Sequence, residues 1–472
     1  MRTTSDICII GGGPAGSTLA ARMAQLGHDV CLIERSSFPR RHLGESLSPG
    51  VRSLLATIGA REAVDAAGFP RVRHVMVNWD EGPRERRDPA AQGLLVDRGH
   101  FDRLLLDNAR SCGVRVLQPA TIREQRRHDE GWSLRIEKGG RAIELRTAFL
   151  ADASGRSRAL PARRRRTGCR TLALYAYWQG SGLPEQPRIE AGTDAWYWGV
   201  PLPDGTYNTL VFVDTAHFRT RPAAPLLSRF RTLIDRSGLL AGCRDPRILG
   251  RVMAADATPY LDEESVTPHS IKVGDAALAL DPLSSSGVQK AIQTALAGAV
   301  VVNTLLRKPE MHAAAFRFYR NGLSDASERH REWATAHYGT VADTGAGKFW
   351  QDRATGSRSS SPPLAAEGLK KNHPTANTPL VLSSGLEFVD LPCIEGEFVR
   401  IKSAVRHPNL EGPVAFLRDW ELAPLLRQVP TGMTSSQLAR FWLPRIPLDS
   451  GRSIIGWLVE RGILVAHRRS AA

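Results

Sequence analysis

The amino-terminal residues alternate between short apolar runs and a glycine-rich break, which predicts a strand, a turn, a helix and a second strand. The segment DICIIGGGPAGSTLAARMAQLGHDVCLIER opens on an apolar run, passes three glycines and then shows apolar residues at helical spacing. Gly11, Gly13 and Gly16 have the spacing G-x-G-x-x-G, and Glu34 ends the second apolar run. In a strand–turn–helix unit, this spacing places backbone N–H groups where a pyrophosphate binds, and the acid reaches a ribose diol. The pattern therefore predicts a dinucleotide site.

Three later segments narrow the choice of dinucleotide. In LLVDRGHFDRLLLDNAR, Arg98 precedes a helical pattern that begins near His100. A strand pattern in FLADASGRSRAL ends at Asp152, and VGDAALALDPLSSSGVQKAI places Asp275 at the end of a small-residue strand, before a helix start. A basic residue and two further acids, spread over so much chain, suit one long dinucleotide threaded through a large domain. This favours FAD over NAD.

The carboxy-terminal part of the chain shows one long helical period and then a break. From residue 316 to residue 339, apolar and aromatic residues recur at spacings of three and four. This predicts an amphipathic helix that packs across the dinucleotide-binding domain. The next stretch, 355–379, is rich in Ser, Pro, Lys and Asn and has little period, so it predicts a linker.

A small separate unit follows the predicted linker. The segment FVRIKSAVRHP predicts a strand, and the apolar spacing in 414–429 predicts a helix. Thr434 is a candidate N-cap of a second helix, a third helix covers 450–460, and Gly462 precedes a short strand. This order predicts a winged-helix-like module. A peptide-recognition module, a DNA-binding wing and a plain dimerisation or packing element are all compatible with it.

Length and cysteine content set bounds on the class of protein. The chain has 472 residues, 42% of them hydrophobic, which is enough for two or three domains. No apolar run reaches the roughly 18 residues of a membrane helix, and the first residues enter a strand directly, so we expect neither a membrane span nor a signal peptide. Six cysteines lie far apart without a Cys-x-x-Cys pair. This suits the cytoplasm and argues against a metal site or a disulfide framework.

The charge is strongly basic, with a net value of +15 that comes mostly from arginine, including RRRR at 163–166. No helix-turn-helix, zinc-finger or stacking-aromatic signature accompanies it, so a solvated arginine-rich surface is favoured over nucleic-acid binding. A basic surface also attracts an acidic protein or peptide.

In combination, the glycine motif with Glu34, VDRGHFDRLLL, DASGRS and GDAALALDP resemble the flavoprotein monooxygenase superfamily over roughly residues 1–350. The superfamily includes aromatic hydroxylases, flavin-dependent halogenases and geranylgeranyl-reductase-like proteins. The resemblance implies an α/β fold with a Rossmann-like FAD-binding domain and an inserted β-sheet substrate domain, here followed by a small C-terminal winged-helix-like domain. The expected boundaries are 1–70, 93–160 and 250–310 for the FAD-binding domain, 71–92 and 161–249 for the substrate domain, 311–354 for C-terminal helices, 355–384 for the linker and 385–472 for the small domain.

The same resemblance implies a set of FAD contacts. Asp275 would bond the ribityl hydroxyls and the pyrophosphate region, and the following helix would point its N-terminus at the flavin ring. DASG replaces the more usual Asp-Gly of NAD(P)H-using hydroxylases, so the electron donor stays open between NAD(P)H and a separate flavin reductase. Dioxygen is the expected co-substrate. The expected FAD-binding residues are Gly11, Gly13, Ala15, Gly16, Glu34, Arg35, Arg41, Arg98, Asp152, Asp275, Pro282, Gly287 and Val288.

Two stretches, HLGESLSPG and AWYWGVPLPDG, resemble the halogenase branch, the second through its Trp-x-Trp-x-x-Pro spacing. A half-buried strand is the alternative explanation of those tryptophans. In the halogenases a lysine amine captures hypohalous acid, but here Arg71 stands at that place and no lysine precedes Lys138. A guanidinium offers no free amine. Ser284 also replaces a glutamate of the Asp-Pro loop. Both departures argue against halogenation.

Hydroxylation survives both losses. By resemblance, a C4a-hydroperoxyflavin gives its oxygen directly to an electron-rich ring, and the protein excludes water, orients the ring and manages one proton. Glu45 and His42 are candidate catalytic proton acceptors or orienters, with capping of the next helix as the alternative for Glu45. Arg71 is a candidate to bind a carboxylate or polarise the peroxide, with a solvated strand position as the alternative. The candidate substrate-binding residues are Trp79, Trp196 and Trp198.

A tryptophan-lined entry and an extra C-terminal unit suit a polymeric substrate. The chain resembles the peptidyl-tryptophan hydroxylases of tryptophylquinone cofactor biogenesis, including those of quinohemoprotein amine dehydrogenase maturation, in its GESLSP turn, its missing lysine and its added C-terminal part. The implied function is FAD-dependent hydroxylation of a tryptophan side chain in a peptide or protein, whose acidity would match the basic surface. A halogenase, a geranylgeranyl-reductase-like flavoprotein and a non-catalytic flavin-binding accessory protein are the alternatives. The oligomeric state stays open.

Overall fold

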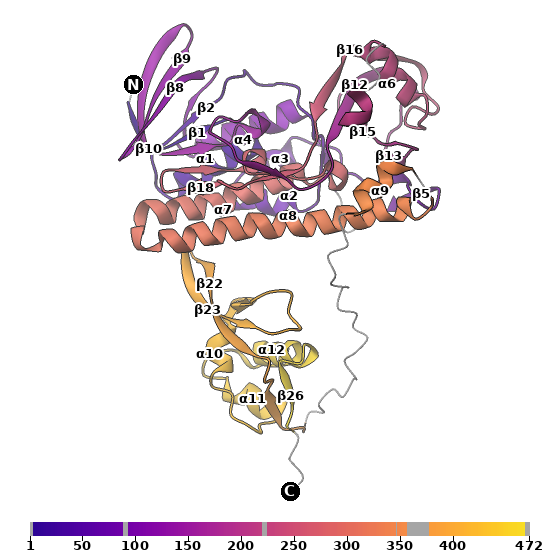
Figure 1. Cartoon of the computed structure of the whole chain (residues 1–472). Coiled ribbons are helices and arrows are strands. Elements are labelled where there is room, and N and C mark those ends of the chain that lie inside the picture. The colour runs from indigo at the N-terminus through magenta and orange to yellow at the C-terminus, as the bar shows by residue number, and fades with distance from the viewer. Residues whose placement is uncertain (1–2, 88–92, 220–223, 346, 356–376, 468–472) are drawn as a thin grey trace. The chain divides into compact units, whose positions relative to one another are not determined.

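The computed structural model describes residues 3–87, 93–219, 224–345, 347–355 and 377–467 (Figure 1). The chain divides into two units. The first contains Met1–His312 and Tyr319–Ser359, and the second contains Ala313–Phe318 and Ser360–Ala472. Most of the predicted linker, and residues 88–92 of the predicted substrate domain, lie outside the described residues.

The first unit contains the predicted strand–turn–helix–strand as β1 (Thr4–Ile10), α1 (Pro14–Gln25) and β2 (Val30–Ile33). The apolar residues of both strands are buried, and the strands lie in the middle of a sheet in which they pair in parallel. α1 packs against both strands, while Cys8 and Cys31 share a core cluster with Leu134 and Leu145. The described sheet has the order β18-β19-β10-β1-β2-β7, and β9 and β8 extend it from β10. The remaining bounds are β7 (Arg115–Leu117), β8 (Thr121–His128), β9 (Gly131–Lys138), β10 (Arg141–Asp152), β18 (Val266–Thr267) and β19 (Ser270–Lys272).

Two helices of the first unit, α4 (Arg98–Ser111) and α7 (Gly287–Arg307), pack against α1 and begin near the predicted polar residues. α4 begins at the predicted arginine, with the Asp97 side chain accepting a hydrogen bond from the His100 N–H. α7 follows the serine-rich loop. Asp275 is placed in a short 3-10 turn, η2 (Gly274–Ala276), and not on a strand as predicted, because β19 already ends at Lys272.

The second sheet has, among the described residues, the antiparallel-rich order β16-β12-β15-β14-β13-β4-β5. Alternation of side chains divides it into two apolar faces. One face packs on α6 (Leu226–Ile234), and the other collects Trp196, Phe212 and the partly buried Trp198. The prediction that both tryptophans share a face is confirmed. The bounds are β4 (His74–Asn78), β5 (Pro83–Arg87), β12 (Thr171–Ser181), β13 (Arg188–Ala191), β14 (Ala195–Pro201), β15 (Tyr207–Asp214) and β16 (Arg244–Asp256).

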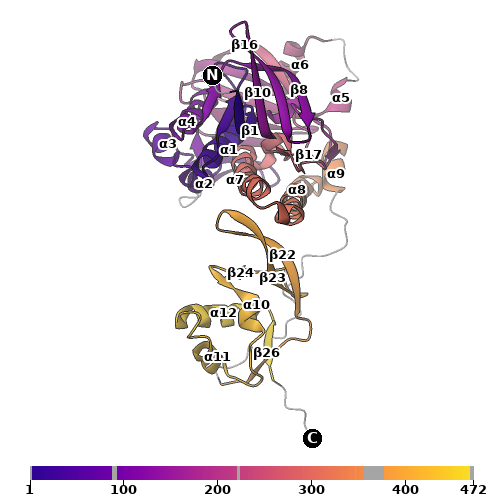
Figure 2. The same cartoon turned by 90° about the vertical axis from the view of Figure 1, so that its left-hand side faces the viewer.

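The predicted long helix is present as α8 (His312–Ala342), and α9 (Lys348–Ala354) follows it. Figures 1 and 2 show α7 and α8 side by side. The Tyr319 hydroxyl donates to the Lys272 carbonyl at 2.7 Å, and Tyr338 reaches the aromatic face of the second sheet. The packing against the first unit is therefore as predicted.

The second unit has a core of its own, built on Leu425, Leu438, Trp442 and Ile454. The Thr434 capping box begins α11 as predicted. The predicted helix over 414–429 is wrong in its first half, because Arg418 adopts φ of 54° in a hairpin turn and only five residues, Leu422–Leu426, are helical. The bounds are β21 (Leu380–Leu382), β22 (Glu387–Glu395), β23 (Phe398–Arg406), β24 (Phe416–Leu417), β25 (Trp420–Glu421), α10 (Leu422–Leu426), α11 (Ser435–Phe441), α12 (Leu448–Glu460) and β26 (Leu464–Ala466).

Candidate functional site

One cavity of about 900 Å³ connects the carboxyl end of the parallel sheet with the aromatic face of the second sheet. At one end it is lined by the glycine turn and Glu34, and at the other by Tyr175, Trp198 and the Asp281-Pro282 loop. No helix in the described residues is long and apolar enough to span a membrane. The cavity is the candidate binding site, because its lining joins a glycine-rich turn to an aromatic face.

The glycine turn leaves open space for a side chain at Gly13 and none at Gly16. Gly11 has φ of 104°, and a Cβ on Gly16 would lie 1.8 Å from the Gly11 carbonyl oxygen. A Cβ on Gly13, by contrast, would meet nothing nearer than the Arg40 guanidinium at 3.7 Å. The helix N-terminus at Gly13 has no side-chain cap, so its free N–H groups face this opening. This arrangement fits a pyrophosphate.

Glu34 closes the turn from below. Its Oε2 accepts from the Gly12 N–H at 2.7 Å, and its Oε1 accepts from the Ser36 N–H at 2.8 Å. Each carboxylate oxygen has more than one acceptor site, so the two bonds fix the carboxylate and leave capacity for a ribose diol. Because Glu34 also lines the cavity, its place agrees with the expected ribose contact.

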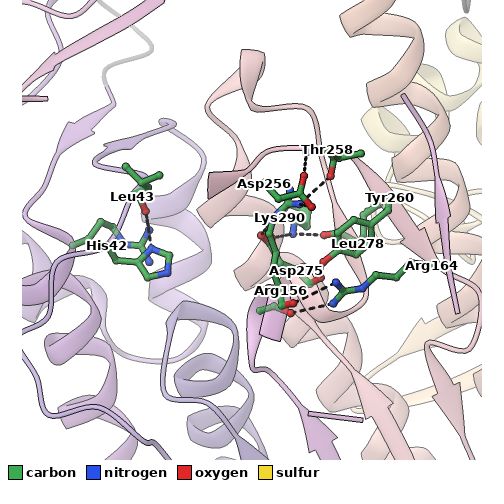
Figure 3. Close-up of polar contacts among 12 residues, drawn as sticks. His42, Leu43, Arg156, Arg164, Asp256, Thr258, Tyr260, Asp275, Leu278 and Lys290 are labelled. Atoms are coloured by element: carbon green, nitrogen blue, oxygen red, sulfur yellow. Dashed lines mark hydrogen bonds and ion pairs between the residues drawn. The ribbon is translucent and has the colours of Figure 1, made fainter. Parts of the chain in front are cut away.

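Asp275 has a rigid cationic environment (Figure 3). The Lys290 ammonium lies 2.5 Å from its Oδ1 and Nε of Arg156 lies 3.7 Å from its Oδ2. Burial by itself would raise the pKa of Asp275, but Lys290 and Arg156 outweigh it and hold that pKa below its usual range. The carboxylate therefore stays ionised and presents acceptors to the cavity, as binding of ribityl hydroxyls requires.

The other expected cofactor residues divide into two groups. Arg35, Arg41, Ala15, Pro282, Gly287, Val288 and the buried Arg98 all line the cavity. Asp152 does not. Its oxygens accept from the Ser154 N–H and hydroxyl and from the Leu160 N–H, so it shapes the loop after β10. Gly16 also stands outside the lining, where it allows α1 to approach the turn. Taken together, the residues present fit FAD.

Glu45 lies on the cavity wall between the two sheets. It is 4% exposed, and its Oε1 accepts from the Tyr177 hydroxyl at 2.9 Å and from the Asn208 side-chain amide at 3.0 Å. Burial raises the pKa of Glu45, although the hydrogen bond from Tyr177 opposes the shift. The alternative role as a helix cap is wrong, because α2 (Val51–Thr57) begins after Gly50 without any side-chain cap.

His42 and the aromatic residues complete the wall. The His42 ring opens into the cavity and lies 2.9 Å from the Leu43 carbonyl through Nδ1. Burial, and then Arg98, lower the pKa of His42, so the neutral ring is favoured. Trp196 stacks on Phe212 with ring centroids 3.7 Å apart, and Trp198 lies beside it in the lining.

Two of the candidate catalytic and substrate-binding residues do not reach this cavity. Arg71 is exposed on the bridge to Leu94, and Trp79 packs behind the wall, 5.3 Å from the Trp350 ring centroid. Neither belongs to the lining. Sequence reasoning also missed Arg156, Lys290 and Asp281. Asp281 is signalled by the Asp-Pro pair, whereas the burial of Lys290 depends on tertiary packing that no local pattern carries.

The chain matches the family model described as tryptophan halogenase over residues 6–89 and 76–372. It belongs to the tryptophan halogenase family. It is 31% identical over 346 residues to a tryptophan 2-halogenase from Chondromyces crocatus. The match covers 67% of this chain and 65% of that protein, which is less than two thirds of that protein's length.

The chain is also similar to two solved structures. One is the peptidyl tryptophan dihydroxylase QhpG, with 28% identity, a TM-score of 0.76 and coverage of 97% and 99%. The other, the flavin-dependent halogenase CmlS, has a TM-score of 0.77 at 22% identity, covers 99% and 96%, and shows the fold alone.

Membership in this family confirms three predictions. The α/β fold with a Rossmann-like FAD domain and a substrate domain is confirmed, as is the class of FAD-dependent oxidoreductase. Flavin-dependent halogenases use FAD and dioxygen with reduced flavin from a separate reductase, so the cofactor prediction is confirmed too. The residue roles, the choice between hydroxylation and halogenation, and the substrate stay predictions.

The contrast between Gly13 and Gly16 gives a test of the pyrophosphate site. Gly13→Val places its side chain in open space, so we expect a normal melting temperature but loss of bound flavin. Gly16→Ala meets the Gly11 carbonyl, so we expect a protein that melts earlier whether or not flavin is added. Absorbance of bound flavin and thermal unfolding measure both effects. Retention of flavin by Gly13→Val would place the phosphates elsewhere.

The cationic environment of Asp275 predicts how flavin binding responds to acid. Because the pKa of Asp275 is lowered, its pairing is present above the usual carboxyl pKa and is lost as pH falls through the lowered value. Lys290→Met removes the nearest cation, so flavin should leave at a pH higher by about 1 to 3 units than in the unchanged protein. Flavin fluorescence during acid titration measures the midpoint.

The matched control is Lys272→Met, which breaks the buried Lys272–Asp262 pair at 2.7 Å, away from the cavity lining. Lys272→Met should lower the free energy of unfolding. The interval between the pH at which flavin is released and the pH at which the protein unfolds should stay as in the unchanged protein. An unchanged release midpoint in Lys290→Met would contradict the role of the cation.

Proposed function

We propose that this chain is an FAD-dependent monooxygenase that hydroxylates a tryptophan side chain in a peptide or protein during quinone cofactor maturation. The observation that carries the proposal is the composition of the cavity wall. Among the described residues, the wall joins the cofactor-binding turn to an aromatic face, and no lysine belongs to it. An aromatic ring could bind to this wall next to the flavin. The described wall has no lysine amine that would capture a halogen species.

The nearest buried lysine does not supply that amine. Lys290 donates to Asp275 and to the Leu278 carbonyl, and it stands outside the lining (Figure 3). Burial lowers the pKa of Lys290 and Asp275 opposes the shift. The two contacts, with the Asp275 carboxylate and the Leu278 carbonyl, hold the side-chain nitrogen away from the lining. Arg71, at the position expected for a halogenase lysine, is exposed outside the cavity.

When bound, reduced FAD would supply the electrons that activate dioxygen. The remaining work falls to side chains of this chain. Trp198 and Tyr175 offer flat surfaces that orient an indole, and the Trp196–Phe212 stack stiffens that wall. Glu45 ties Tyr177 and Asn208 together and so fixes the border between the two sheets. The neutral His42 offers a polar group without adding charge.

A polymeric substrate is supported by two observations. QhpG, to which this chain is similar over 97% of its length, acts on peptidyl tryptophan. The net charge of +15 favours association with an acidic protein or peptide.

Halogenation is the second candidate, and the family favours it. The matching family model and the 31% identical relative from Chondromyces crocatus are both tryptophan halogenases. A halogenase would require an amine from outside the observed wall, or a different way to hold the halogen.

The two candidates differ in the atom that the product gains. We expect the flavin-loaded protein, with a flavin reductase and a tryptophan-containing acidic peptide, to add the mass of one or two oxygen atoms, taken from isotopically heavy dioxygen. Parallel reactions with free tryptophan and with chloride or bromide give the comparison. Mass spectrometry of the products decides: a chlorine or bromine isotope pattern without added oxygen would overturn hydroxylation in favour of halogenation.

The position of Arg71 gives a second, simpler prediction. Because Arg71 is exposed and outside the lining, Arg71→Ala and Arg71→Lys should both keep turnover within about twofold, as surface changes of about 0.5 kcal/mol or less do. Steady-state turnover with the peptide measures this. A large loss in Arg71→Ala, restored in Arg71→Lys, would return a cation at this position to the active site.

A further inference from the structure

Asp281 is a partly buried carboxyl group that nothing in the proposed function yet uses. It precedes the short turn η3 (Pro282–Ser284) and belongs to the cavity lining. Its Oδ1 accepts from the Leu283 N–H at 3.1 Å and from the Tyr338 hydroxyl at 2.9 Å. Its main-chain carbonyl lies 3.0 Å from Nε2 of His330. Within the part of the chain that the structure describes, Oδ2 has no hydrogen-bond partner.

Tyr338 and His330 of α8 hold Asp281 next to the aromatic cluster of the second sheet. Tyr338 belongs to the same cluster as Trp196 and Phe212, so the hydroxyl that holds Asp281 is itself fixed by aromatic packing. The Trp196 side chain is 2% exposed. Burial raises the pKa of Tyr338, while the Trp196 indole acts on the Tyr338 hydroxyl as a hydrogen-bond donor and opposes the shift. The hydroxyl that holds Asp281 is therefore also in polar contact with the aromatic wall.

The surroundings of Asp281 favour a proton acceptor. Burial raises its pKa, while the Leu283 N–H, Tyr338, His330 of α8 and Arg353 of α9 act in the opposite direction. The other cation nearby, Lys290, is committed to Asp275. A carboxylate with a raised pKa is a stronger base than a solvated one, and Asp281 belongs to the lining of the cavity in which the ring is expected.

Glu45, a more deeply buried carboxyl of the same wall, is less suited to this task. Its Oε1 already accepts from Tyr177 and Asn208, and its Oε2 accepts from the Gly44 N–H at 2.8 Å. A group held by three donors stiffens a wall, whereas a group with one free oxygen can receive a proton. The geometry thus separates an orienting carboxyl from a reactive one.

We propose that Asp281 is the catalytic base that removes the ring proton from the aromatic substrate, an inference that rests on the proposed function. When an electrophilic oxygen has added to a ring carbon, the C–H bond at that carbon breaks. Its electron pair returns to the ring and restores aromaticity, and the proton goes to Oδ2 of Asp281. Neutral Asp281 then releases the proton to water. Tyr338 is a positioning residue, since its hydroxyl fixes Oδ1, while Oδ2 has no partner among the described residues.

The loop has no carboxyl at position 284, where Ser284 stands. Asp281 supplies a carboxyl within the same loop. The family resemblance implies a glutamate at 284, and this chain has an acid three residues earlier, at Asp281. The same proton must leave the ring whether oxygen or halogen has been added. The role of Asp281 therefore does not depend on which of the two products is formed.

The test compares Asp281→Asn with the unchanged protein on a peptide whose indole ring is deuterated. The unchanged protein should show little isotope effect, because a positioned base makes proton loss fast. Asp281→Asn should form product about 10² to 10⁴ times more slowly, with a primary isotope effect, because proton loss becomes limiting. Glu45→Gln, a second carboxyl of the same wall, is the control. It is expected to lower turnover without creating an isotope effect.

A second measurement needs no turnover and so separates this inference from the proposed function. N-methylquinolinium, a flat aromatic cation, resembles the ring after electrophilic addition, and 2-naphthol is its neutral counterpart. With the oxidised flavin-loaded protein, Asp281→Asn should weaken binding of the cation at least about tenfold and leave the neutral compound unchanged. Tyr338→Phe should weaken cation binding by a smaller factor. Bound flavin and melting temperature show that each variant is folded.

Turnover of Asp281→Asn within about twofold of the unchanged protein, or slowing without an isotope effect, would overturn the role of Asp281. Equal cation binding in both proteins would overturn it as well, whatever the activity. If the unchanged protein modifies no aromatic ring but binds the cation through Asp281, the proposed function fails and the placement of Asp281 facing an aromatic guest stands.

Discussion

The close approach of Gly16 to the Gly11 carbonyl sets the position of everything that follows in the first unit. A Cβ at Gly16 would lie 1.8 Å from that oxygen, and a Cβ at Gly11 would lie 2.6 Å from the Ala153 carbonyl. Only glycine at both positions lets α1 start directly above β1 and beside the loop after β10. The free N–H groups of α1 then face the cavity, and Glu34 can hold the turn from the neighbouring strand. Without this contact the phosphate site and the rest of the cavity would not align.

The second constraint is electrostatic. A cavity that takes a dinucleotide and an aromatic ring must be polar at one end and apolar at the other. Lys290 and Arg156 keep Asp275 ionised at the cofactor end, while burial raises the pKa values of Glu45 and Asp281 along the aromatic wall. Three carboxyls on one cavity thus have different proton affinities because their neighbours differ. This is the separation that acid–base chemistry on a bound ring requires.

Much of this could be predicted where local pattern and chemistry coincide. The glycine spacing, Glu34 and the apolar runs determined the first strands and helix, because each residue acts on its immediate neighbours. The facing of Trp196 and Trp198 followed from strand alternation. The role of Asp152 in its own loop could not be predicted, because a strand-end acid reads the same whether it binds a ligand or Ser154 and Leu160. The hairpin at Arg418 was mistaken for helix because its apolar spacing fits both structures.

Tertiary context explains the remaining differences in the site. Trp79 lies behind the wall because Trp350 of α9 packs on it, a contact between residues far apart in sequence. The partner that fixes Asp281, Tyr338, comes from the long helix α8, whose periodicity indicates a packed helix and nothing about its contacts. Such pairings need the fold before they can be recognised.

The central claim is that a flavin and an aromatic ring meet in one cavity of this chain. The most direct measurement is an experimental structure of the protein with FAD and a tryptophan-containing peptide. The account predicts the pyrophosphate over Gly13, the ribityl chain at Asp275 and the indole between the flavin ring and Trp198. An indole bound outside this cavity, or a flavin that does not contact the glycine turn, would contradict it.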